Sequence, residues 1–126
     1  MIRASMLILI GWGLLSGQVA ATPAQFNQDL GKLAISITDE ATGDQADIAK
    51  GEQLANTRCV ACHGEAMLKM MPAYPNLQGQ KAAYLFKQLL DFKQGRRQNP
   101  LMQGQAAMLS ELEMKDVAYY YSTLTP

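Results

Sequence analysis

The sequence predicts an all-α protein, and two observations carry that prediction. Apolar residues recur at the three- and four-residue spacing of amphipathic helices over residues 26–37, 47–58, 81–94 and 110–124. Turn residues separate these segments, and no stretch alternates between apolar and polar residues as a strand would. We expect a few helices in one small domain, because the chain without its leader is long enough for one domain but not for two.

The start of the chain has the pattern of a secretory signal peptide. Arg3 provides a positive charge, residues 6–15 form an apolar stretch, and small residues precede an expected cleavage after Ala21, with Ala24 as the second choice. The apolar stretch is too short to span a bilayer, and no later stretch is apolar and long enough to do so. The mature protein is therefore expected to be periplasmic, without a transmembrane anchor.

The chain is expected to divide into a signal peptide over residues 1–21, an extension over 22–46 and a core domain over 47–126. A short amphipathic helix in the extension is predicted by four apolar residues at helical spacing: Phe26, Leu30, Leu33 and Ile37. Residues 42–44, Thr-Gly-Asp, are the expected break after it. The apolar stripe of this helix is expected to pack on the chain's own domain, and docking on a partner is the alternative.

The first core helix is expected to run from about Asp47 to the end of the 47–58 segment. Asp47 can cap its start, and its apolar face contains Ile48, Gly51, Leu54 and Ala55. A glycine inside a helix costs about 1 kcal/mol relative to alanine. Gly51 therefore suggests that another backbone approaches closely at this point.

A middle helix is expected over about residues 81–94 and a last helix from Ser110 onwards. The inward residues of the middle helix are Ala82, Leu85, Leu89 and Phe92, and Gly95 is a natural stop. Ser110 and Glu113 fit a capping box. One side of the last helix is lined by Met114, Val117, Tyr120, Tyr121 and Leu124.

Two loops are expected between these helices. Residues 64–79 contain Pro72 and Pro75 and lose the helical pattern. Residues 99–102 are expected to be extended or turned, because the residue before Pro100 is pushed away from helical geometry.

The strongest functional signal is Cys59-Val60-Ala61-Cys62-His63, which contains both cysteines and the only histidine of the chain. A C-x-x-C-H run is the attachment signature of a c-type haem. Two thiols three residues apart can each add to one vinyl group of the same porphyrin, and the next imidazole can bind the iron from one face. The run therefore predicts one covalently attached haem c, with His63 as an axial ligand.

Other roles fit this run less well. A structural zinc site usually needs four ligands, whereas two cysteines and one histidine supply three. A thioredoxin-like C-x-x-C needs strands around it, and none is expected here. A disulfide between Cys59 and Cys62 could form before haem attachment, but it closes too small a loop to stabilise a fold.

The second axial ligand is expected to be a methionine, because no other histidine exists in the chain and a thioether sulfur suits haem iron. Six methionines follow the motif: Met67, Met70, Met71, Met102, Met108 and Met114. The first three lie too near His63 to reach the opposite face, and the last two lie where the last helix needs core residues. Met102, in the loop between the middle and last helices, is the predicted ligand.

The sequence resembles the mono-haem class I cytochromes c of bacterial periplasms and single units of their di-haem relatives. The match covers about residues 47–125. Its motifs are Gly51-Glu52-Gln53-Leu54, Cys59 to Gly64, Pro75 to Gln80, Tyr84, Leu89, Phe92, Gly95, Arg97, Met102, Leu109-Ser110 and residues 118–121. The extension and the methionine-rich residues 65–74 depart from the family pattern.

The resemblance implies the class I cytochrome c fold, with its helices packed around one haem. Cys59 and Cys62 would form the thioether bonds, and His63 and Met102 would be the axial ligands. The carbonyl of Pro75 would accept a hydrogen bond from the other ring nitrogen of His63, which fixes the ring.

The resemblance also implies roles farther from the iron. Gly51 and Tyr120 would mark the crossing of the first and last helices. Arg97 and Tyr84 could reach the haem propionates.

The implied function is one-electron transfer without catalysis, because a six-coordinate iron has no open site for a substrate. The expected partners are redox proteins, including acidic or membrane-bound oxidoreductases. Basic residues in the middle of the chain could steer an acidic partner, and an ordinary solvated surface is the other interpretation. Eleven basic and eleven acidic residues balance, so nucleic-acid binding is not expected.

Three alternatives stay open. The amphipathic stretch over 26–37 would suit a permanent haem c subunit of a larger exported oxidoreductase. An iron left open because Met102 does not bind would suit an enzyme acting on peroxide or a small gas. Met67, Met70 and Met71 could form a docking surface at the haem edge or pack under their loop.

Overall fold

The computed structural model of the protein describes residues 21–38, 41 and 45–126, and every regular element within these residues is helical. The elements in chain order are α1 (Pro23–Lys32), α3 (Ile48–Leu54), the π-helical turn η1 (Ala55–Cys59), α4 (Val60–His63), α5 (Glu65–Met70), α6 (Ala82–Lys93), α7 (Pro100–Ala107) and α8 (Glu111–Thr123). The all-α prediction is confirmed. The predicted signal peptide, apart from Ala21, and the predicted break at 42–44 lie outside the described residues.

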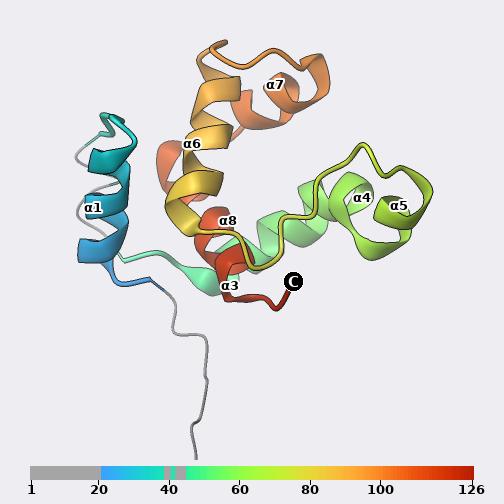
Figure 1. Cartoon of the computed structure of the whole chain (residues 1–126), viewed down its shortest axis with the longest axis horizontal. Coiled ribbons are helices and arrows are strands. Elements are labelled where there is room, and N and C mark those ends of the chain that lie inside the picture. Colours follow the sequence, from blue (N-terminus) through green and yellow to red (C-terminus); the bar gives the residue numbers. More distant parts are fainter. Residues whose placement is uncertain (1–20, 39–40, 42–44) are drawn as a thin grey trace, which may run out of the picture.

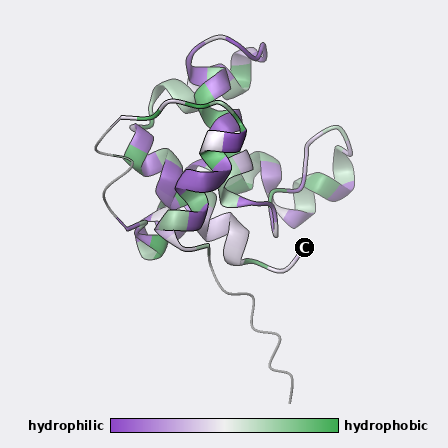
Figure 2. Cartoon of the chain, turned by 60° about the vertical axis from the view of Figure 1, so that its left-hand side comes forward, coloured by the Kyte–Doolittle hydropathy of each residue, from purple (hydrophilic) through white to green (hydrophobic). Residues whose placement is uncertain are grey.

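Helix α8 organises the molecule. Helix α3 crosses α8, α6 packs along it, and α1 and α7 each pack on α6. In Figure 1, α1 lies to the left of α6 and α8, α4 and α5 lie to the right, and α7 lies above. The helices in Figure 2 carry hydrophilic and hydrophobic residues together, as expected when each helix buries one face.

The apolar stripe of α1 packs on the chain's own domain, as expected. Phe26 and Leu30 are 1% and 2% exposed. The ring of Phe26 meets Phe86 of α6 edge-on with 5.6 Å between centroids, and Tyr119 of α8 at 5.2 Å. The helix ends at Lys32, before the last two residues of the predicted stripe, and those residues pack against the core from a non-helical segment.

The α3–α8 crossing depends on Gly51. Helix α3 begins at Ile48, where the Asp47 side chain accepts a hydrogen bond from the backbone N–H of Lys50 at 3.0 Å. A Cβ atom at Gly51 would lie 2.2 Å from the carbonyl oxygen of Asp116 in α8. The predicted close approach of two backbones is confirmed. Ile48, which was placed on the apolar face of this helix, is 39% exposed at its first position, one turn before Gly51.

Two segments that were expected to be loops contain helices. Residues 65–70 form α5, because Glu-Ala-Met-Leu-Lys-Met consists of good helix formers, and the helix ends before Pro72. Asn99 is extended, as expected before a proline, but its side chain caps α7 by accepting a hydrogen bond from the Met102 N–H at 3.1 Å. Pro100 occupies the first helical position, where its fixed φ is favourable. Met102 is therefore helical.

Helices α6 and α8 match the predicted middle and last helices. The buried residues of α6 include the expected Ala82, Leu85 and Phe92, together with Phe86 and Leu90, whereas Leu89 is half-buried. The capping box of α8 is present: Ser110 Oγ accepts from the Glu113 N–H at 3.1 Å, and a Glu113 carboxylate oxygen accepts from the Ser110 N–H at 3.0 Å. Met114, Val117 and Tyr121 are buried as expected, and Tyr120 is half-buried.

Buried polar residues of α8 hold the segment that precedes α3. Lys115 is fully buried, and its Nζ donates to the carbonyl oxygen of Ala41 at 2.7 Å. Asp116 accepts a hydrogen bond from the backbone N–H of Asp47 at 2.8 Å. The chain between α1 and α3 is therefore tied to the centre of the fold at two points.

Candidate haem-attachment site

The C-x-x-C-H motif lies on one continuous helical segment. Helix α3 continues through η1, which ends at Cys59, into α4, which carries Cys62 and His63. The chain then turns sharply at Gly64, whose N–H donates to the Val60 carbonyl oxygen at 2.8 Å. A Cβ atom at Gly64 would lie 2.5 Å from that oxygen, so glycine fits directly after the histidine. The crossing at Gly51 therefore fixes the helix from which both thiols and the imidazole project.

Both cysteines are free thiols and partly buried. Burial raises the pKa of the Cys59 thiol, although a hydrogen bond with the Tyr121 hydroxyl and the charge of Arg58 act in the opposite direction. Burial also raises the pKa of the Tyr121 hydroxyl. Before haem attachment, Cys59 is therefore a protonated thiol held against α8.

His63 is oriented by a backbone carbonyl. Its ring is 8% exposed, and Nδ1 lies 2.9 Å from the carbonyl oxygen of Pro75. A carbonyl oxygen only accepts hydrogen bonds, so Nδ1 carries the proton and donates it, and the lone pair of Nε2 stays available for a metal. Tyr74 adds an edge-on ring contact with 6.1 Å between the centroids.

The donor set fits haem c. Two free thiols three residues apart and an imidazole with an available Nε2 are the groups that thioether attachment and axial ligation require. Among the described residues, no three His, Cys, Asp or Glu side chains are arranged to hold a metal ion between them. This arrangement suits an iron brought by a porphyrin and does not suit a zinc centre.

Met102 lies on another element of the molecule. It is the third residue of α7, is partly buried and packs against the core cluster. Figure 1 shows α7 above α8 and the α4–α5 pair to the right, so His63 and Met102 come from different arms of the fold. The structure brings the two cysteines, His63 and Pro75 together, and Met102 lies on a different helix, α7.

The other methionines divide by exposure. Met114 is 0% exposed, as expected for a core residue, but the expectation that Met108 is a core residue is wrong. Met108 is 55% exposed because it follows the end of α7, where its sulfur lies 3.4 Å from a guanidinium nitrogen of Arg58. Met70 and Met71 are 68% and 48% exposed.

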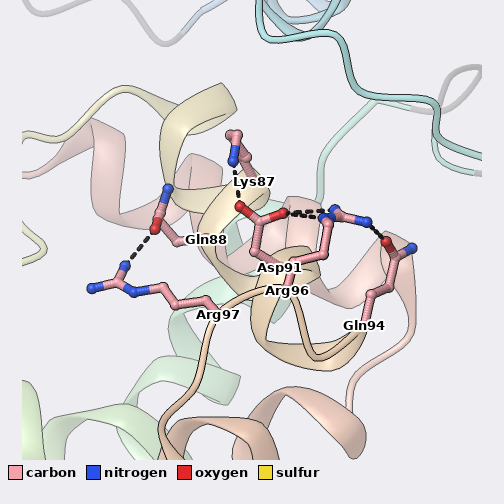
Figure 3. Close-up of polar contacts among 6 residues, drawn as sticks. All are labelled: Lys87, Gln88, Asp91, Gln94, Arg96 and Arg97. Atoms are coloured by element: carbon pink, nitrogen blue, oxygen red, sulfur yellow. Dashed lines mark hydrogen bonds and ion pairs between the residues drawn. The ribbon is translucent and has the colours of Figure 1, made fainter.

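Tyr84 lies on α6, and Arg97 lies in the turn region that follows it. The Arg97 guanidinium stacks on the Phe92 ring at 4.7 Å from its centroid. It also donates a hydrogen bond to the Gln88 side chain (Figure 3). Tyr84 is 44% exposed on α6. Their role at the haem propionates stays a prediction.

No role at this site was predicted for Tyr121 or Tyr74. Tyr121 was expected only as an apolar residue of the last helix. A signal for a further role was present, because a buried tyrosine needs a polar partner for its hydroxyl. The partner, Cys59, becomes visible only once α3 and α8 cross.

Fold and site together define a class of protein: a small helical protein that attaches haem c through two thioether bonds. The family model described as cytochrome c matches residues 48–125. The chain therefore belongs to the cytochrome c family. Its cofactor is a covalently attached haem c.

The relatives are bacterial cytochromes c. The chain is 46% identical over 77 residues to cytochrome c4 of Thiocapsa roseopersicina, an alignment that covers 61% of this chain and 40% of that protein. It is 41% identical over 80 residues to cytochrome c-554(548) of Halomonas halodenitrificans, covering 61% of this chain and 95% of that protein. It is 43% identical over 79 residues to the thiosulfate dehydrogenase electron acceptor of Stutzerimonas stutzeri, covering 62% and 37%.

The fold is also similar to a solved structure. The crystal structure of reduced recombinant cytochrome c4 from Pseudomonas stutzeri superposes with a TM-score of 0.52 at 28% identity, over 67% of this chain and 55% of that one. The chain thus spans about half or less of the cytochrome c4 and electron-acceptor relatives but nearly all of cytochrome c-554(548). The matched region corresponds to a single haem unit, as the sequence predicted.

Proposed function

We propose that this protein is a periplasmic one-electron carrier whose haem iron is held by His63 and Met102 and whose porphyrin is joined to Cys59 and Cys62. The observation that supports this assignment best is the hydrogen bond from His63 Nδ1 to Pro75 at 2.9 Å on a nearly buried ring. It leaves Nε2 as the coordinating nitrogen and restricts rotation of the imidazole.

The bound haem supplies a reversible ferrous–ferric couple. The contribution of the protein is to keep the surroundings of that couple constant. The Pro75 carbonyl and the Tyr74 ring hold His63, and the Asn99 cap holds the first turn of α7, which carries Met102. If His63 and Met102 both bind the iron, no coordination position would be left for a substrate.

We propose redox proteins as partners, including oxidoreductases, by analogy with the relative named as an electron acceptor of thiosulfate dehydrogenase. Encounters between such proteins are small and short-lived, which favours turnover. The apolar stripe that suggested a permanent subunit has Phe26 and Leu30 buried against α6 and α8. That surface is therefore occupied within the chain, which supports a carrier that dissociates from its partners.

We also propose export and cleavage after Ala21. Thr22 would then begin the mature chain while still capping α1, because its Oγ1 accepts a hydrogen bond from the Gln25 N–H at 3.2 Å. No helix in the described residues is long and apolar enough to cross a membrane. Amino-terminal sequencing of protein from a periplasmic extract tests this proposal, and a first residue upstream of Ala21 would contradict it.

Replacement of the proposed sulfur ligand tests the electron-carrier assignment. Met102→Ala is expected to abolish the sulfur-to-ferric-iron charge-transfer band, because alanine leaves the iron without a thioether. The reduction potential is expected to fall for the same reason. An alkaline-pyridine spectrum of the same preparation should still report thioether-linked haem, since Cys59 and Cys62 are intact.

Met108→Ala is the matched control, because Met108 is near the end of the same helix and is exposed. It should leave the charge-transfer band unchanged. A band that survives in Met102→Ala, or disappears in Met108→Ala, would overturn the ligand assignment. An open iron already present in the unmodified protein would favour the enzyme alternative.

A further inference from the structure

Three methionines lie within one turn at the end of helix α5. The N–H of Met71 donates to the carbonyl oxygen of Met67 at 2.8 Å, so these two residues are one helical turn apart. Met70 is three residues from Met67 within the same turn. Side chains at these spacings are neighbours on a helix surface, so Met67 and Met70 share one side of α5. Met71 follows them directly as the residue at which the backbone leaves the helix, with φ −129° and ψ 81°.

This face is not an ordinary buried packing surface. Met70 is 68% exposed, Met71 is 48% exposed and Met67 is half-buried, whereas Met114, which packs in the core, is 0% exposed. Adjacent exposed apolar side chains on a soluble protein commonly mark a binding surface.

The charged residues of α5 point away from the methionine face. Glu65 and Lys69 are each two residues from Met67, which places them on the opposite side of the helix. They are paired with each other, with 2.6 Å between Lys69 Nζ and a Glu65 carboxylate oxygen. The methionine face therefore presents only soft sulfur donors, with no carboxylate beside them on the helix.

We propose that Met67, Met70 and Met71 bind one Cu(I) ion. Thioether sulfur is a soft ligand that selects Cu(I), whereas Mg²⁺, Ca²⁺ and Mn²⁺ prefer carboxylate and carbonyl oxygen. Three neutral sulfurs on a single turn suit a monovalent soft ion of low coordination number. None of these three methionines is a proposed haem ligand, so this site is separate from the iron.

The site adjoins the support of the axial histidine. The N–H of Tyr74 donates to the Met71 carbonyl oxygen at 3.0 Å, and the ring of Tyr74 contacts the His63 ring edge-on. A bound ion would therefore lie close to the loop that orients His63. The experiment must for this reason use the haem-loaded protein, because the loop contacts the proposed iron ligand His63.

The test is a titration of ferrous holoprotein labelled with ¹³C at the methionine methyl groups. Ag(I), a redox-inert ion with the ligand preference of Cu(I), is added in chloride-free buffer and followed by NMR. One equivalent is expected to shift the methyl signals of Met67, Met70 and Met71. The signals of Met102, Met108 and Met114 should not move. Cu(I) itself is then measured anaerobically by competition with a chromophoric chelator.

Two variants distinguish binding by these three sulfurs from binding to any exposed methionine. A variant with Met67→Leu, Met70→Leu and Met71→Leu keeps similar side-chain volume and is expected to bind at least about tenfold more weakly, since even changes beside a metal ligand cost about 10–100-fold. Met108→Leu removes one exposed methionine elsewhere and should retain the affinity. Unchanged haem spectra verify that both variants fold.

Two results would overturn the proposal. One is the absence of shifts at one equivalent, which would mean that the haem edge or loop packing already occupies these methionines. The other is equal affinity in the triple variant, or displacement of the Met102 signal, which would place the ion elsewhere.

Discussion

The lack of a side chain at Gly51 allows the close α3–α8 crossing that positions the haem motif. The carbonyl of Asp116 occupies the space that a Cβ atom would fill, and the Cβ atom of Tyr120 lies 3.1 Å from the same point. Both obstacles are backbone or the base of a side chain, so neither can rotate away. The close approach holds the helix that leads to Cys59 against α8.

Gly51→Ala is therefore expected to destabilise the protein. The added methyl group would force α3 and α8 apart, at a cost of about 1–3 kcal/mol for overpacking. Guanidinium unfolding of the holoprotein, followed by circular dichroism, measures the change.

Gly31→Ala is the control, because Gly31 lies in α1 and a Cβ atom there would meet nothing within 4 Å. It should stabilise the protein slightly, by about 0.4–1 kcal/mol, because alanine restricts the unfolded chain. Equal effects of the two substitutions would refute the steric role of Gly51.

At the residue scale, the motif could be predicted because its chemistry is contiguous in sequence. Two thiols and an imidazole within five residues identify haem attachment without knowledge of the fold. The Pro75 carbonyl could be named only through the family resemblance, because any residue has a carbonyl. The contact of Tyr121 with Cys59 depends on the angle at which α8 crosses α3, which local sequence does not encode.

At the scale of helices, one proline follows the end of a helix and another begins one. Pro72 follows the end of α5, whereas Pro100 begins α7. Both prolines were predicted to lie in loops. Asn99 was the distinguishing signal, since a residue with a short polar side chain before proline is a typical helix cap. Capping residues thus identified α8 correctly and would also have identified α7.

The carboxyl end of α6 is held by a charged cluster around Asp91. Lys87, one turn earlier, and Arg96, in the following turn, both donate to its carboxylate, and the Arg96 Nε distance is 2.7 Å (Figure 3). Burial acts to raise the pKa of Asp91, but the hydrogen bonds from Lys87 and Arg96 outweigh it and hold the pKa below the usual 3.8.

Asp91→Asn is expected to lower stability at neutral pH by about 1.5–3 kcal/mol, the usual range for hydrogen bonds to a charged group. Because the folded pKa lies below the unfolded one, the stabilisation is complete above about pH 4 and disappears as the pH falls through the folded pKa. The variant should therefore lose less stability on acidification than the unmodified protein. Denaturant midpoints measured from pH 7 down to pH 3 give both quantities.

Asp29→Asn provides the comparison for the acidic range. Asp29 pairs with Lys32 at 3.1 Å on the surface of α1, where solvent screens the pair. Its stability curve should follow that of the unmodified protein. If the Asp91→Asn curve does so too, the cluster does not stabilise α6.

At the scale of the whole molecule, α1 behaves as part of the core. Its Phe26 ring completes an aromatic group with Phe86 and Tyr119, and burial raises the pKa of the Tyr119 hydroxyl to about 12. The helical spacing of the stripe predicted that α1 packs on its own domain. It could not predict which helices receive it, because periodicity shows a buried face but not its partner.

Phe26→Ala is expected to destabilise the whole domain by about 3–5 kcal/mol, the typical cost of removing a buried phenylalanine. Loss of secondary structure and loss of the haem charge-transfer band should shift together to lower denaturant concentration. Gln25→Ala, at an exposed position of the same helix, should change little. An unaltered midpoint for Phe26→Ala would show that α1 unfolds independently of the rest.

The position of α1 also determines how the molecule would sit on a solid support. Thr22 lies at the start of a helix on the opposite side of α6 and α8 from α4 (Figure 1). A linker from Thr22 to an electrode would therefore hold the haem-binding segment, Cys59 to His63, away from the conducting surface. A layer of protein molecules attached in this way would exchange electrons slowly with the electrode. The haem-binding segment would stay accessible to proteins in solution.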